Sequence, residues 1–122
     1  MPCDWPMDNQ LKDFDFSVII PVHTGSNYMP LLLQSLEDQT VLPQEIVIVD
    51  SSLDNDIASI IRNMNGRIPI VYKKIDLAYP GDARNIGVEI AKMEWIAFLD
   101  STTVPEHDWL ERCVEMAIEK KA

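Results

Sequence analysis

Residues 45–52 read E-I-V-I-V-D-S-S, in which four consecutive β-branched apolar residues are followed at once by an aspartate and two serines. This run lacks the alternation of a half-exposed strand and the 3.6-residue period of a helix, so it favours a strand buried on both faces. Three further short runs share this character, at residues 16–22, 68–73 and 94–100. We therefore expect four buried parallel strands.

Stretches with helical spacing lie between and after these runs. Apolar residues recur three and four positions apart within residues 28–38, 57–64, 83–91 and 110–118. Such stripes are typical of helices that pack against a sheet. The alternation predicts an α/β fold, with a parallel, doubly wound, Rossmann-like sheet of about four strands in the usual order 3-2-1-4.

The start of the last helix has its own local signal. Thr103 and, three residues later, Glu106 have the spacing of a capping box, in which each side chain bonds a free backbone N–H of the first turn. We expect the last helix to begin at this pair.

Length and composition agree with one soluble domain. The chain has 122 residues, of which 47% are hydrophobic and 25% charged. We assign residues 15–122 to the domain and the polar, proline-interrupted residues 1–14 to a tail. A cytoplasmic location is expected because no run approaches the ~20 apolar residues that cross a bilayer, and because residues 1–14 lack the pattern of a signal peptide. Peripheral association with a membrane stays open.

Charge narrows the choice of partners. The formal net charge is −10, from 20 acidic and 10 basic residues. Such a surface repels phosphate backbones, so no nucleic-acid partner is expected. A bound diphosphate would need a local basic group or a metal ion for the same reason.

Two aspartates close predicted strands. Ligands of doubly wound sheets bind at the carboxyl ends of the strands, near the point where the strand order reverses. With the order 3-2-1-4, Asp50 and Asp100 should project into one crevice, where a carboxylate can accept hydrogen bonds from a base or a ribose. The alternative is that each aspartate only caps a loop or the following helix.

Residues 81–87, G-D-A-R-N-I-G, open a predicted helix after Tyr79 and Pro80. Free N–H groups at a helix start favour an anion, and Arg84 is suited to a bidentate contact with a phosphate. The alternative is an ordinary helix start, with Gly87 allowing close contact with a strand. The segment is neither a P-loop nor the G-x-G-x-x-G dinucleotide fingerprint.

Five segments together resemble family 2 glycosyltransferases. They are S-V-I-I-P-V-H at residues 17–23, S-L-E-D-Q-T at 35–40, E-I-V-I-V-D-S-S at 45–52, G-D-A-R-N-I-G at 81–87 and W-I-A-F-L-D at 95–100. The matches follow the family's order and span about residues 16–111. They are individually weak and specific as a set.

The resemblance implies a GT-A fold whose amino-terminal half binds a nucleotide-diphosphate sugar. It also implies roles for particular residues: Pro21, Val22 and His23 would line the base pocket, Asp50 would bond the base, Arg84 would lie near the nucleotide or its diphosphate, and Asp100 would lie by the ribose and the metal site. The expected activity is transfer of the sugar to the hydroxyl of an unknown acceptor.

The sequence departs from the family at the metal site. Thr102 stands where the D-x-D motif has its second acid, and a threonine hydroxyl is a poor ligand for Mg²⁺ or Mn²⁺. Metal binding at Asp100 is therefore in doubt. The chain also ends at Ala122, before the family's acceptor-binding half and general base, so we expect a truncated fold without an identifiable base.

Three functional hypotheses follow. The first is the donor-binding half of a glycosyltransferase, and the second is a catalytically inactive GT-A-like binding or scaffolding domain. A phosphorylated receiver domain is disfavoured because residues 21–23, P-V-H, lack an acidic pair and no fifth strand is predicted. An exposed sheet edge would also allow self-association.

Overall fold

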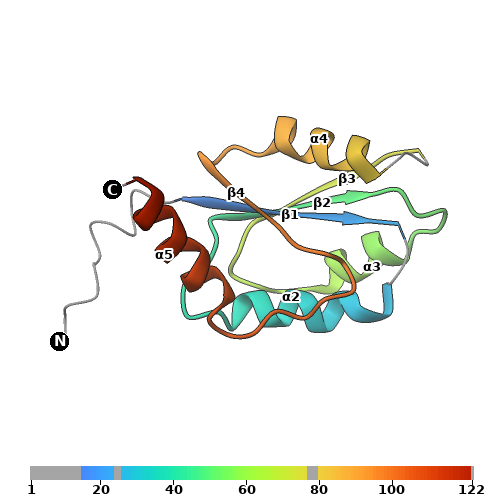
Figure 1. The fold of residues 1–122 in the computed structure, drawn as a ribbon. Helices are drawn as coiled ribbons and strands as arrows, with labels where there is room; N and C mark the ends of the chain where they lie inside the picture. The colour runs from blue at the N-terminus through green and yellow to red at the C-terminus, as the bar shows by residue number, and fades with distance from the viewer. Residues whose placement is uncertain (1–14, 24–25, 77–79, 122) are drawn as a thin grey trace.

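A computed structural model describes residues 15–23, 26–76 and 80–121. In this part of the chain a four-stranded parallel sheet has the order β3-β2-β1-β4 (Figure 1). Its strands are β1 (Phe16–Val22), β2 (Glu45–Asp50), β3 (Ile70–Lys74) and β4 (Trp95–Phe98). The doubly wound α/β fold and the strand order predicted from the sequence are confirmed, whereas the tail predicted at residues 1–14 lies outside the described residues.

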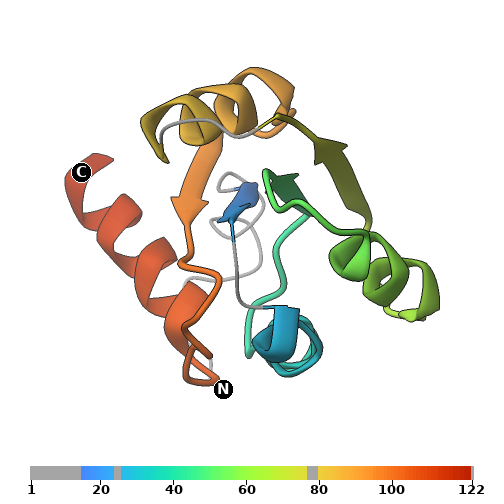
Figure 2. The same cartoon turned by 90° about the vertical axis from the view of Figure 1, so that its right-hand side faces the viewer.

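Helices cover both faces of the sheet. They are η1 (Ser26–Tyr28), α2 (Met29–Glu37), α3 (Asp56–Asn63), α4 (Pro80–Ile90) and α5 (Trp109–Lys121). Figure 2 shows α4 across one face and α2 and α3 side by side across the other, with α5 beside β4. None of the helices in the described ranges is long and apolar enough to span a membrane.

The central strands are buried because of this two-sided cover. Every residue of β2 is buried, and in β1 only Pro21 is partly exposed. Side chains of β1 and β2 alternate between a cluster under α2 and α3 and a cluster under α4. The continuous apolar run in residues 45–52 follows from burial on both sides.

The helical stripes pack as predicted. Ile57 of α3 and Leu32 and Leu36 of α2 are buried in one cluster, and Ala83 of α4 is buried in the cluster on the opposite face. At Gly87 a Cβ atom would lie 2.5 Å from Cγ2 of Ile19 on β1, so only glycine permits this approach of α4 to the sheet.

The boundaries of two strands, β3 and β4, differ from the prediction. β3 runs from Ile70 to Lys74. It begins at Ile70 because the carbonyl of Pro69 accepts from the N–H of Ile46, whereas Pro69 has no N–H with which to continue the ladder. β4 ends at Phe98, so the predicted strand end at Asp100 was wrong by two residues. The N–H of Leu99 still bonds the carbonyl of Ile19, at 3.0 Å.

The predicted capping box was also wrong, because α5 begins at Trp109. A side chain from α2's end performs the capping instead. Oε1 of Gln39 accepts from the N–H of Leu110 at 2.9 Å, and its Nε2 donates to the carbonyl of Glu106 at 2.6 Å. Gln39 is buried, and it fixes the start of α5 to the end of α2. Local spacing could not reveal this cap because its partners are distant in the chain.

We predict that Gln39→Ala lowers the free energy of unfolding by about 2 kcal/mol, because it leaves a buried N–H and a carbonyl without their partner. Urea unfolding followed by circular dichroism measures the change. Gln39→Glu should recover only part of the loss, since a carboxylate accepts from Leu110 but cannot donate to Glu106. The control is Gln34→Ala on exposed α2 surface, expected to stay within about 0.5 kcal/mol of the parent. Equal stability of the two alanine variants would disprove the capping role of Gln39.

Candidate functional site

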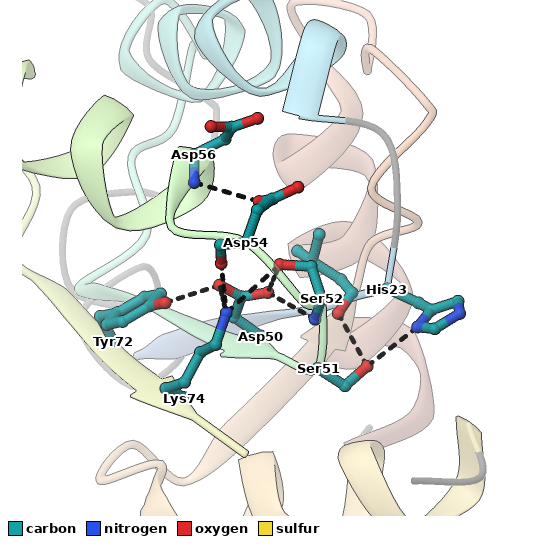
Figure 3. A network of polar contacts seen from close by, with 9 residues as sticks. His23, Asp50, Ser51, Ser52, Asp54, Asp56, Tyr72 and Lys74 are labelled. Atoms are coloured by element: carbon teal, nitrogen blue, oxygen red, sulfur yellow. Dashed lines mark hydrogen bonds and ion pairs between the residues drawn. The ribbon is translucent and has the colours of Figure 1, made fainter. Parts of the chain in front are cut away.

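Polar side chains gather where the parallel strands end, at their carboxyl edge. Asp50 is the last residue of β2, and in the sheet register it stands opposite Lys74, the last residue of β3. Figure 3 shows Tyr72 and Lys74 reaching from β3 toward Asp50, with His23 on the other side of the loop that follows β2. The edge that the topological rule singles out is therefore where the polar groups lie.

The Asp50 carboxylate is completely buried and is bonded on both oxygens. Its Oδ1 accepts from the N–H of Ser52 at 2.9 Å and from the Ser52 hydroxyl at 2.6 Å. Its Oδ2 accepts from the Tyr72 hydroxyl at 2.6 Å and from Lys74 Nζ at 3.5 Å. Asp50 thus caps the loop at Ser52, as the alternative interpretation predicted, and its side chain also accepts from two residues of β3.

These contacts set the ionisation of the pair. Burial alone would raise the pKa of Asp50, but the hydrogen bonds from Ser52 and Tyr72 and the charge of Lys74 together hold it below its usual value. The pKa of Tyr72 is raised, because its hydroxyl is desolvated and donates to the charged carboxylate. Asp50 is therefore an anion and Tyr72 a neutral donor at neutral pH.

The end of β1 lies beside this network. The side chain of Val22 is buried in the core, and its carbonyl accepts from the N–H of Ser51 at 2.8 Å and from the Ser51 hydroxyl at 3.1 Å. The same hydroxyl lies 3.5 Å from Nδ1 of His23, an exposed residue (Figure 3). Pro21 is partly exposed. The structure thus brings the predicted residues at the end of β1 close to the Asp50 loop.

Arg84 lies on the α4 face of the sheet and is exposed. Its guanidinium carbon is 5.8 Å from the centre of the Phe98 ring, a cation–π contact that orients the arginine. Phe98 itself is 46% exposed at the end of an edge strand. Arg84 therefore belongs to a second group, with β4, rather than to the Asp50 network.

Asp100 is exposed and follows β4 by two residues. Its Oδ1 accepts from the N–H of Thr102 at 3.0 Å and from the Thr102 hydroxyl at 3.1 Å. Among the described residues no three His, Cys, Asp or Glu side chains are grouped so as to hold a metal ion. One carboxylate whose neighbour serves as its hydrogen-bond donor does not fit a metal held by protein ligands alone.

A model of glycosyl transferase family 2 matches residues 17–122. The chain belongs to this family. Its similarity to individual members is moderate: 33% identity over 103 residues to an uncharacterized glycosyltransferase of Rickettsia bellii, covering 83% of this chain and 15% of that one. Chondroitin synthase of Escherichia coli is 27% identical over 116 residues, covering 93% of this chain and 17% of that one. The chain thus spans a small part of the curated relatives it matches.

Solved structures resemble the family 2 chain over most of its length. TarS of S. aureus in complex with UDP-GlcNAc is 27% identical, with a TM-score of 0.73 over 87% of this chain and 32% of that one. The mannosyltransferase PcManGT of Pyrobaculum calidifontis, in complex with GDP-Man and Mn²⁺, is 22% identical, with a TM-score of 0.59 over 71% of this chain and 27% of that one. These matches confirm the prediction that this chain has the fold of the amino-terminal part of a GT-A glycosyltransferase.

Two residues of the Asp50 network were missed in the sequence. Tyr72 lies in the run at residues 68–73, which predicts only a buried strand, and Lys74 is the residue that follows this run. A signal was present: two polar residues two positions apart on a strand share one face of the sheet. Only the register of β3 against β2 shows that this face is the one that carries Asp50.

We predict that Asp50→Asn lowers the free energy of unfolding by about 2–3 kcal/mol at pH 7. The asparagine amide cannot accept all four hydrogen bonds that the carboxylate accepts, and its NH₂ group would face the Lys74 ammonium. The folded-state pKa of Asp50 lies below its unfolded value of about 3.9, so its contribution is complete above that pH and disappears as pH falls through the folded pKa. Urea unfolding of both proteins between pH 7 and pH 2 should therefore show a difference that narrows below about pH 4.

The matched control is Asp54→Asn, in the same loop and exposed, with an expected change under about 0.5 kcal/mol at every pH. A gap between the parent and Asp50→Asn that stays constant down to pH 2 would contradict an ionised Asp50.

Proposed function

We propose that this chain supplies the donor-binding half of a glycosyltransferase. It would hold a nucleoside-diphosphate sugar at the carboxyl edge of the sheet, for transfer of the sugar to an acceptor hydroxyl. The observation that carries the proposal is the gathering of Asp50, His23 and the Ser51 loop at that edge, in a chain that belongs to family 2. The complex of the similar TarS structure with UDP-GlcNAc supports it.

The proposed roles follow the family resemblance. Pro21, Val22 and His23 would border the base, with Val22 contributing through its backbone because its side chain is buried. Asp50 would accept a hydrogen bond from the base. Departure of the nucleoside diphosphate needs positive charge nearby, which an arginine can supply.

Arg84 is the proposed partner of the diphosphate. Its guanidinium is exposed, and its contact with Phe98 holds it on the sheet side of α4, so it is oriented before any ligand arrives. Asp100, which follows Phe98 closely in the chain, would bond the ribose. A base that removes the acceptor's proton is not assigned to any described residue.

Metal use is proposed to be weak in this chain. A divalent ion at the diphosphate would neutralise its charge, and Asp100 alone would offer it a carboxylate. The hydroxyl of Thr102 donates to that carboxylate and so competes for it. The same observation favours the second candidate function, a binding or scaffolding domain that retains the donor site without turnover.

We predict that the chain binds UDP or GDP saturably in calorimetric titration, and that Arg84→Gln weakens the binding about tenfold or more through loss of a charge-assisted contact. Arg62→Gln is the matched control, because Arg62 is exposed on α3, away from α4. Its binding should stay within about twofold of the parent. A folded chain that binds neither nucleotide would refute donor binding.

We further predict that Mn²⁺ changes the nucleotide affinity of the parent chain by less than about threefold, whereas Thr102→Asp makes the affinity rise steeply with Mn²⁺. The reason is that the substitution supplies a second carboxylate two residues from Asp100. Titrations with and without Mn²⁺ measure the effect, and Thr103→Asp serves as the neighbouring control. A strong Mn²⁺ dependence in the parent chain would show that Asp100 suffices.

A further inference from the structure

Lys74 covers the buried carboxylate of Asp50. The Lys74 side chain is 37% exposed, while that of Asp50 is 0% exposed. Its ammonium lies 3.5 Å from Asp50 Oδ2 and 3.5 Å from the Ser52 hydroxyl, and it donates to the carbonyl of Asp54. Figure 3 shows this ammonium between the carboxylate and the loop that follows β2. Lys74 is therefore the most exposed of the residues that donate to Asp50.

The network leaves no free position on Asp50. A carboxylate has about four lone-pair sites, and four donors already occupy them. Three of these bonds measure 2.6–2.9 Å, whereas the contact from Lys74 Nζ is the longest, at 3.5 Å. The Tyr72 and Ser52 donors belong to a strand and to a tight loop, but a lysine ammonium lies on a flexible stem. A ligand N–H that reaches Asp50 must take the place of Lys74.

We infer that Lys74 is a specificity-determining residue, which exchanges its contact with Asp50 for the carbonyl oxygen of a nucleotide base. The inference rests on the proposed function. The base N–H would bond Asp50 Oδ2, and the released ammonium would keep the Asp54 carbonyl and donate to the base carbonyl adjacent to that N–H. The buried anion would thus keep four donors, and the ammonium would stay beside it.

This pairing selects a class of base. Uracil and guanine carry an N–H directly beside a carbonyl group, which complements an acceptor on Asp50 beside a donor on Lys74. Cytosine and adenine present the reverse pattern, a bare ring nitrogen beside an amino group. That pattern would set a lone pair against the carboxylate and a donor against the ammonium, and unpaired buried groups discriminate strongly. The site should therefore accept uridine and guanosine nucleotides and reject cytidine and adenosine ones.

The neighbouring lysine offers a matched control. Lys73 precedes Lys74 on β3 and carries the same charge, but successive strand residues point to opposite faces. Tyr72 packs with the α2 and α3 cluster, and Val71 and Ile75 pack with the α4 cluster. Lys73 therefore shares the α4 side and does not face Asp50, so its substitution removes a charge from β3 without touching the Asp50 contacts.

The test is calorimetric titration of the full chain with UDP, GDP, CDP and ADP. The parent should bind either UDP or GDP, whichever it binds more tightly, about tenfold or more tightly than both CDP and ADP. In Lys74→Met the affinity for that nucleotide should fall about tenfold, and the affinity for CDP and ADP by less than about threefold. The discrimination between the bases would then be lost. Lys73→Met should keep the discrimination of the parent. A purely structural role for Lys74 would weaken all four nucleotides alike.

The outcomes separate the two proposals. If the folded parent binds none of the four nucleotides, the proposed function fails and the inference fails with it. If the parent binds all four with similar affinity, donor binding stands and the role of Lys74 is overturned, a result that needs no variant. If Lys74→Met keeps the parent's discrimination, the role of Lys74 is again overturned. Collapse of the discrimination in Lys74→Met alone supports it.

Discussion

Burial of β1 and β2 on both faces is the constraint on which the rest of the structure depends. Helices lie against each side of this pair, so polar side chains are tolerated only at the ends of the strands and only with partners. β2 illustrates the rule, because it begins at Glu45 and ends at Asp50 and both acids are buried. Oε2 of Glu45 accepts from the Ser17 hydroxyl and from the N–H of Lys92, each at 2.6 Å. One end of β2 thus ties the sheet together, and the other end forms the candidate site.

The residues that resemble the family divide into a group that supports the fold and a group at the candidate site. Gly87 lets α4 approach β1, and Gln39 joins the end of α2 to the segment before α5. That segment covers residues 99–108 and carries Asp100 near its start, and Gln39 fixes its far end. Thr40 adds to the same junction, because its N–H bonds the carbonyl of His107 at 2.8 Å. Residues outside the candidate site therefore hold the loop that carries Asp100.

Asp50 belongs to both groups, which explains the electrostatics of the carboxyl edge. Its charge is compensated from β3 and from its own loop, so the site is organised before a ligand binds. In a chain with a net charge of −10, Lys74 and Arg84 supply local positive charge at the candidate site. The two lie in different contact groups, one with Asp50 and one with Phe98.

The sequence by itself determined the layers, the strand order and the sheet edge at which the candidate site lies, because buried runs and helical stripes depend on spacing within each segment. It also pointed to Asp50, His23 and Arg84 through their positions in those segments. Only the tertiary structure decided the partners of Asp50 and the cap of α5. Each of these depends on contacts between residues distant in the chain, such as Tyr72 and Lys74 with Asp50 or Gln39 with Leu110. Such contacts are set by sheet register and helix packing, which no local pattern encodes.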